Sequence, residues 1–132
     1  MADNDLTEIF LDKAGEALAG AQSEYANGRY NNCANRAYYA YFQAAIAALI
    51  AAEITPRGSQ WGHDFVQGQF VGQLINRRKV CSADLRQVLS NTLALRQTAD
   101  YEHRRVTERE ASRALRWARP LLEAVQTGGE AR

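Results

Sequence analysis

One stretch of the chain, RQTADYEHRRVT at residues 96–107, combines an arginine and a histidine that could do chemistry together. Six residues separate Arg96 from His103. A guanidinium can hold a phosphate through two parallel hydrogen bonds, and an imidazole can accept or donate a proton near neutral pH. Together these groups suffice for metal-independent RNA cleavage, in which the ribose 2′-OH attacks the adjacent phosphate. Arg96 and His103 are therefore the candidate catalytic residues.

Helical periodicity places this pair on one face of a helix that we predict over residues 83–105. At about 100° per residue, Arg96 and His103 lie within about 20° of each other. They continue the apolar stripe that Leu85 and Leu89 begin, whereas a solvated arginine belongs on the opposite face. The pair is therefore expected on the inward or partner-facing side.

A structural interpretation of the same residues also exists. A half-buried arginine needs a partner, because an isolated charge out of water is very costly. Asp100 lies four residues after Arg96 and can accept a hydrogen bond from its guanidinium. The alternative to a catalytic pair is thus an Arg96–Asp100 ion pair within the helix, with His103 capping the helix C-terminus. In the catalytic interpretation Asp100 supports Arg96.

The rest of the chain shows helical spacing, and the alternation typical of strands is nearly absent. Asn27-Gly28 is a turn signal, and ITPRGSQWG at residues 54–62 has the composition of a loop. Thr107 and Glu110 have the spacing of a capping box that opens the last helix. The remaining predicted helices cover roughly residues 6–27, 30–53 and 63–75.

These elements predict an all-α fold. Short connections between helices favour an up-and-down bundle of four to five helices. We expect one domain over residues 1–132, with residues 127–132 forming a frayed tail. Gly68 and Gly72 lie four apart in the third helix, where they indicate either a close helix approach or a partly irregular segment.

Composition narrows the functional classes. The 132 residues carry a net charge of +1, so overall charge gives no reason to expect a nucleic-acid coat or a membrane surface. Cys33 and Cys81 lack the spacing of a zinc site, and no phosphate-binding loop or dinucleotide fingerprint occurs, so no metal or cofactor is expected. The longest apolar run, residues 44–52, is far short of the ~20 residues of a spanning helix. The acidic stretch MADNDLTEIF lacks the charged n-region and the apolar h-region of a signal peptide. We expect a cytoplasmic protein.

Three segments resemble those of HEPN-domain proteins. GRYNNCANRAYYAYFQAAIAALI at residues 28–50 is similar to the family's second helix, in which a glycine-aromatic turn leads into an Arg-Ala-Tyr-Tyr-Ala-x-Phe run. LRQTADYEHRRVT resembles the family's later Arg-x-x-Ala-Asp-Tyr segment, and EASRALRWARPLLEAV resembles its final Ala-rich helix. The segments occur in the family's order, and the resemblance covers roughly residues 6–125.

The resemblance implies a helical bundle that pairs as a homodimer. Many members are ribonucleases with an Arg-x(4–6)-His motif, and the motifs of two protomers face each other at the dimer interface. Many are toxins encoded beside a minimal nucleotidyltransferase antitoxin. By this resemblance Arg96 holds the phosphate, His103 transfers a proton, and the expected partners are a second copy, the antitoxin and RNA.

Two residues depart from the family pattern. Gln97 follows Arg96 where the family often has Asn, Asp or His. Tyr101 occupies the histidine position of the commonest, four-residue spacing, and a phenol with a pKa near 10 is a poor base at neutral pH. In some antitoxin pairs a nearby tyrosine is adenylylated by the nucleotidyltransferase, which makes Tyr101, on the predicted outward face, a candidate modification site.

The sequence leaves three functions open. The first is a HEPN-type toxin that cleaves RNA as a homodimer. The second is a non-catalytic HEPN module that docks a nucleotidyltransferase or binds a nucleotide, with Arg96 and Asp100 as a structural pair. The third is a plain helical interaction protein. Of the remaining polar and aromatic residues, Tyr38 and Tyr39 are expected in the core or an interface, and His63 is expected to cap or pack.

Overall fold

The computed structural model describes residues 2–130, with side chains from residue 5 to residue 125. Helices account for the regular structure, and the described residues form no strand, which confirms the predicted all-α bundle. In chain order the elements are α1 (Ala2–Ala26), α2 (Tyr30–Ala51), α3 (His63–Gln69), the π-helix η1 (Phe70–Arg77), the 3₁₀ turn η2 (Ala83–Leu85), α4 (Val88–Tyr101) and α5 (Glu108–Glu130).

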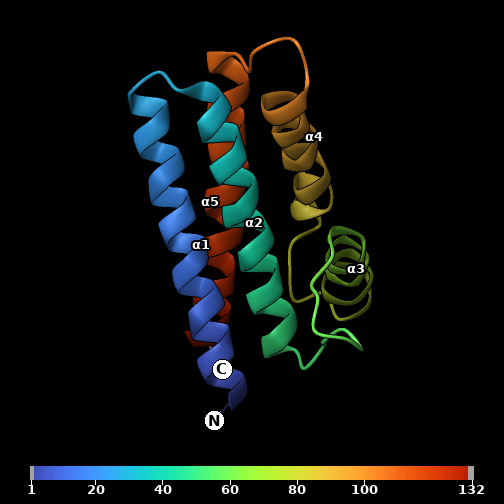
Figure 1. Cartoon of the computed structure of the whole chain (residues 1–132). Coiled ribbons are helices and arrows are strands. Elements are labelled where there is room, and N and C mark those ends of the chain that lie inside the picture. Colours follow the sequence, from blue (N-terminus) through green and yellow to red (C-terminus); the bar gives the residue numbers. More distant parts are fainter. Residues whose placement is uncertain (1, 131–132) are drawn as a thin grey trace.

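The helix α2 lies at the centre of the bundle. It packs against α1, α4 and α5, and consecutive long helices run in alternating directions (Figure 1). Most of its side chains are buried, and many of these are alanines. Small side chains let neighbouring backbones approach closely, and a helix that is apolar nearly all round is a buried helix. The Ala-rich run at residues 44–52 is therefore a core segment.

The third predicted helix changes geometry part of the way along. It begins as α3 and continues as η1, whose side chains Phe70, Leu74 and Ile75 are buried in the main core. A Cβ added at Gly68 or Gly72 would meet no atom within 4 Å. The expectation that these glycines mark a close helix approach is therefore wrong.

The fourth predicted helix is shorter at both ends than residues 83–105. Ser82 caps the 3₁₀ turn η2, since its hydroxyl oxygen accepts a hydrogen bond from the backbone N–H of Asp84 at 3.2 Å. Helix α4 begins only at Val88 and ends at Tyr101, after which Glu102 has extended backbone angles (φ −90°, ψ 160°). Residues 102–107 form the loop to α5.

The predicted capping box at the start of α5 is present. The Thr107 N–H donates to Glu110 Oε1 at 3.0 Å, and the Glu110 N–H donates to Thr107 Oγ1 at 3.1 Å. The helix continues through residues 127–130, and residues 131–132 of the expected tail lie outside the described residues. Among the described helices, none combines the length and the apolar character needed to cross a bilayer.

Substitution of two glycines that differ in their backbone angles tests the conformation assigned to each. Gly28 has a φ of +75°, whereas Gly68 is helical with open space around its Cβ position. Gly28→Ala should lower the free energy of unfolding by about 1 kcal/mol, because a side chain disfavours the left-handed region. Gly68→Ala should raise it by about 0.5–1 kcal/mol, through higher helix propensity. Urea unfolding followed by circular dichroism measures both, and shifts of the same sign would contradict the assigned backbone.

Candidate functional site

Arg96 lies on α4 at the edge of the core, with its side chain 24% exposed. Its Nε is 3.3 Å from Oδ2 of Asp100, one helical turn later, so the predicted ion pair is present. Asp100 in turn accepts hydrogen bonds from the Asn35 amide of α2, at 3.0 Å to Oδ2 and 3.2 Å to Oδ1. The carboxylate is thus fixed from a second helix and holds the guanidinium in place.

Two aromatic rings of α2 complete the surroundings of the guanidinium. Arg96 Cζ lies 5.7 Å from the ring centroid of Tyr38 and 5.3 Å from that of Tyr39. Such cation–π contacts stabilise a charge that is partly out of water. Nε is enclosed but not aligned for a hydrogen bond, while the two terminal nitrogens are not enclosed and make no hydrogen bond to the described residues. Those terminal N–H groups remain available for an anion.

Tyr38 links this arginine to His63, which lies at the first residue of α3. The Tyr38 hydroxyl is 3.1 Å from His63 Nδ1, and the Tyr38 side chain is 4% exposed. Burial raises the pKa of Tyr38 to about 12, against a smaller opposing effect of the Arg96 charge. Burial also lowers the pKa of His63, and the nearby Asp64 carboxylate opposes that shift. The cluster therefore joins three elements: α2, α3 and α4.

His103 is not part of this cluster. It lies in the exposed loop after α4 and, within the described part of the chain, makes no contact with Arg96. The prediction of one continuous face failed because the helix ends before His103. Val106, which is 3% exposed, turns the chain back into the core, and its N–H donates to Asn31 Oδ1 of α2 at 2.9 Å.

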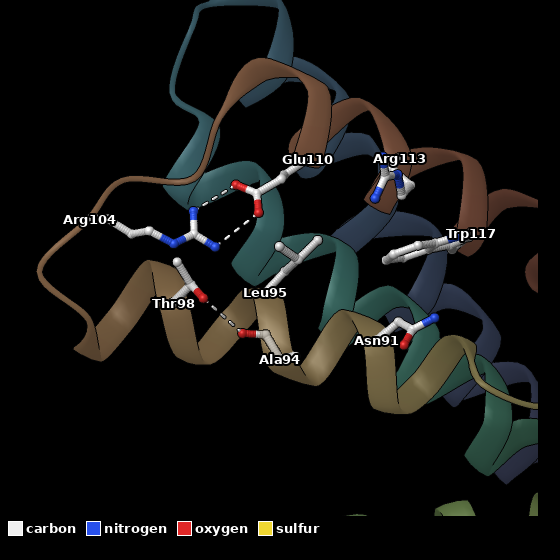
Figure 2. A pocket seen from close by; sticks show the side chains of 8 residues that line it. All are labelled: Asn91, Ala94, Leu95, Thr98, Arg104, Glu110, Arg113 and Trp117. Carbon is white, nitrogen blue, oxygen red and sulfur yellow. Dashed lines mark hydrogen bonds and ion pairs between the residues drawn. The ribbon is translucent and has the colours of Figure 1, made fainter.

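Arg104 holds the same loop from the other side. Its terminal nitrogens donate to both carboxylate oxygens of Glu110, at 2.9 and 3.0 Å (Figure 2). The two residues form one wall of a shallow pocket between α4 and α5, which is also lined by Thr98 and Trp117. Thr98 and Arg96 project about 160° apart around α4, so the pocket lies on a different side of the helix from Arg96.

Tyr101 is the last residue of α4, and its side chain is 74% exposed. The outward position predicted for it is observed. It lies in the sequence between Arg96 on the helix and His103 in the loop. A modification of its hydroxyl is therefore sterically accessible.

The chain belongs to the HEPN domain family, whose pattern matches residues 7–128. No curated protein sequence matches the chain at a significant level. Membership of this family supports, in general terms, a nuclease or an RNA-related module.

The paired Glu110 gives a prediction about pH. The hydrogen bond from Arg104, followed by that from the Thr107 backbone, lowers the pKa of Glu110 to about 2. A carboxylate with a lowered pKa in the folded state contributes stability above its ordinary pKa and loses that contribution as the pH falls toward the folded value. We expect Glu110→Gln to destabilise the protein at pH 7 and the deficit to shrink between about pH 5 and about pH 2.

Chemical unfolding across this pH range tests the expectation. Glu123→Gln is the matched control, because Glu123 is an exposed carboxylate of the same helix with no ion pair recorded among the described side chains. A deficit for Glu110→Gln that stays constant down to pH 2 would show that the charge of Glu110 is not what stabilises the loop.

Proposed function

We propose that the protein is a HEPN-type toxin: a metal-independent endoribonuclease that works as a homodimer and is neutralised by a nucleotidyltransferase antitoxin. The observation that supports the proposal is how the Arg96 side chain is oriented and which of its nitrogens remain without a hydrogen bond. Its guanidinium is oriented by Asp100, Tyr38 and Tyr39, while its terminal nitrogens stay available. A fixed guanidinium of this kind can hold a phosphate in bidentate fashion and stabilise the charge that builds on its oxygens.

His103 is the proposed proton-transfer partner, and the homodimer is the proposed means of bringing it into the site. Within one chain His103 is exposed on the loop that follows the Arg96 helix. An exposed imidazole on a loop fixed at Val106 and Arg104 can be presented to a second chain. In the dimer, His103 of one protomer then completes the Arg96 site of the other.

Tyr101 is the proposed point of control by the antitoxin. Its exposed phenol oxygen can attack the α-phosphate of ATP held by a nucleotidyltransferase, so that an O–P bond forms and pyrophosphate leaves. The attached nucleotide would lie between the arginine and the histidine of the motif. Its bulk and negative charge would exclude an RNA phosphate from Arg96.

A second function is favoured by a specific observation. Arg96 already has a carboxylate partner, and His103 lies off the helix that carries it. Both facts suit a non-catalytic HEPN module, in which Arg96 and Asp100 stabilise the bundle while the protein docks a nucleotidyltransferase or binds a nucleotide. Cleavage assays separate the two functions.

RNA cleavage by the purified protein in EDTA tests the ribonuclease. Arg96→Ala should lower kcat/KM for RNA by about 100- to 1000-fold, because it removes the group that stabilises the phosphate charge. His103→Ala should lower kcat by about 100-fold or more, through loss of a proton transfer. Arg57→Ala is the matched control, since Arg57 is an exposed loop arginine.

All variants must first show the same circular dichroism and the same oligomer size. Equal loss of activity in Arg57→Ala would mean that the effect is one of total charge. A parent protein that binds RNA or a nucleotidyltransferase but cleaves no RNA would contradict the toxin and support the binding module.

Modification of Tyr101 can be tested by intact mass. Incubation with a minimal nucleotidyltransferase and ATP should add one AMP to the parent and none to Tyr101→Phe. Tyr25→Phe, which alters a tyrosine at the end of α1, is the control and should be modified like the parent. AMP on Tyr101→Phe would place the modified residue elsewhere.

A further inference from the structure

The proposed cleavage requires two proton transfers, and the motif supplies one histidine. The 2′-oxygen enters and the 5′-oxygen leaves on opposite sides of phosphorus, because the displacement is in line. One group must take the proton of the 2′-OH and another must protonate the 5′-oxygen. The sequence contains two histidines, so His63 is the remaining imidazole.

His63 and Arg96 contact the same side chain, that of Tyr38. The Tyr38 ring lies under the Arg96 guanidinium at 5.7 Å, and the Tyr38 hydroxyl is 3.1 Å from His63 Nδ1. The Tyr38 and His63 rings are also adjacent, with centroids 6.1 Å apart. A phosphate held by the terminal nitrogens of Arg96 would therefore lie next to the tyrosine that positions the histidine of α3.

Tyr38 is itself held rigidly. Its ring stacks on Phe42 of the same helix, with centroids 5.7 Å apart and an interplanar angle of 20°. Among the described residues, the His63 ring makes no hydrogen bond other than that at Nδ1, and Nε2 is not enclosed. One ring nitrogen is therefore fixed and the other is left for a substrate, which is how a histidine is prepared for proton transfer.

We propose that His63 is a second catalytic histidine of the Arg96 site and that Tyr38 is its positioning residue. The assignment rests on the proposed ribonuclease function. The neutral imidazole donates its Nδ1–H to the Tyr38 oxygen, which leaves the lone pair of Nε2 free to accept a proton. Removing the Tyr38 hydroxyl would leave the ring nitrogen without its partner and the tautomer unfixed.

The step balances without any further reactant. Nε2 of His63 accepts the proton of the 2′-OH as the O2′–P bond forms. The P–O5′ bond breaks, and the 5′-oxygen takes a proton from the second imidazole, that of His103. The products are a 2′,3′-cyclic phosphate and a 5′-hydroxyl, and solvent restores the two histidines to their starting forms.

The surroundings of His63 favour the form that accepts a proton. The groups that face it are Tyr38 from α2, Asp64 on α3 itself and, across the Tyr38 ring, Arg96 from α4. Burial lowers the pKa of His63, and the Asp64 carboxylate acts in the opposite direction. At neutral pH the imidazole is therefore predominantly neutral, as a general base must be.

Single-turnover cleavage of an RNA that the parent cleaves, followed in EDTA from pH 5 to pH 9, tests the assignment. His63→Gln should slow cleavage by about 100-fold or more and remove the acidic limb of the pH–rate profile. Tyr38→Phe keeps the ring under Arg96, so it should slow cleavage by about tenfold and shift the acidic limb. Tyr30→Phe is the matched control, because Tyr30 lies on the same helix and its hydroxyl bonds to Glu108 instead.

Binding of the same RNA with a single 2′-deoxy substitution at the cleaved position separates catalysis from structure. The Kd of His63→Gln for this probe should stay within about twofold of the parent, since the lost group acts on a proton and not on affinity. A loss of affinity as large as the loss of rate would overturn the catalytic role. Parental rates in His63→Gln, with Arg96→Ala inactive, would overturn it as well and leave the ribonuclease standing.

A parent that cleaves no RNA would overturn both the ribonuclease and the role of His63. Where His63→Gln or Tyr38→Phe fails to fold, ¹⁵N NMR of the imidazoles in the parent decides. Addition of the 2′-deoxy RNA should shift the Nε2 resonance of His63. An unchanged His63 resonance at saturating RNA would overturn the proposal.

Discussion

The burial of α2 is the constraint on which the rest of the molecule depends. Its alanines let three long helices pack around it, and the same helix supplies the polar atoms that fix everything near Arg96. Several of its side chains reach the elements around Arg96: Asn31 bonds to the α4–α5 loop, Asn35 to Asp100, Tyr38 to His63, and Tyr39 contacts Arg96. A rotation of α2 would therefore disturb the ion pair, the loop and the start of α3 together.

The Arg96 guanidinium is paired with a carboxylate through one nitrogen, while its other nitrogens remain available to a ligand. A guanidinium out of water is costly unless it is paired, and a pair that satisfied all five N–H groups would leave nothing for a substrate. Here the pairing falls on Nε, and the aromatic faces of Tyr38 and Tyr39 offset part of the lost hydration. The Asn35 amide donates to the same carboxylate from α2 and so fixes its position beside Nε. A lysine could not reproduce this division between Nε and the terminal nitrogens.

Local chemistry predicted much of the fold and part of the site. A sequence displays directly both simple periodicities and pairs of residues within four positions of each other. Such signals predicted the all-α class, the turn at Gly28, the Thr107–Glu110 capping box and the Arg96–Asp100 pair. The sequence did not predict the position of His103, because α4 ends before that residue. The chain then turns into the core at Val106, whose N–H bonds to Asn31, 75 positions away in the chain. The Tyr38–His63 contact, across 25 positions, had no spacing to reveal it. For Gly68 and Gly72 the sequence left two interpretations, and the observed one is the irregular segment, because the helix changes from α to π geometry there and no atom lies close to either glycine.

The two histidines differ in how they are held, and under the proposed function this difference assigns their tasks. His63 is fixed by the core through Tyr38 and shares its neighbour with Arg96 of the same chain. His103 lies on an exposed loop that is anchored on both sides, and among the described residues it contacts none of the side chains around Arg96. Each protomer would then contain the phosphate-holding arginine and a base, and the second protomer would supply the acid. Because the leaving oxygen is protonated only when the acid is in place, such a site would be complete in the dimer and incomplete in the single chain. Tyr101, one residue after Asp100 and two before His103, is exposed, so under the same proposal a bulky group on its hydroxyl would be accommodated without disturbing the core.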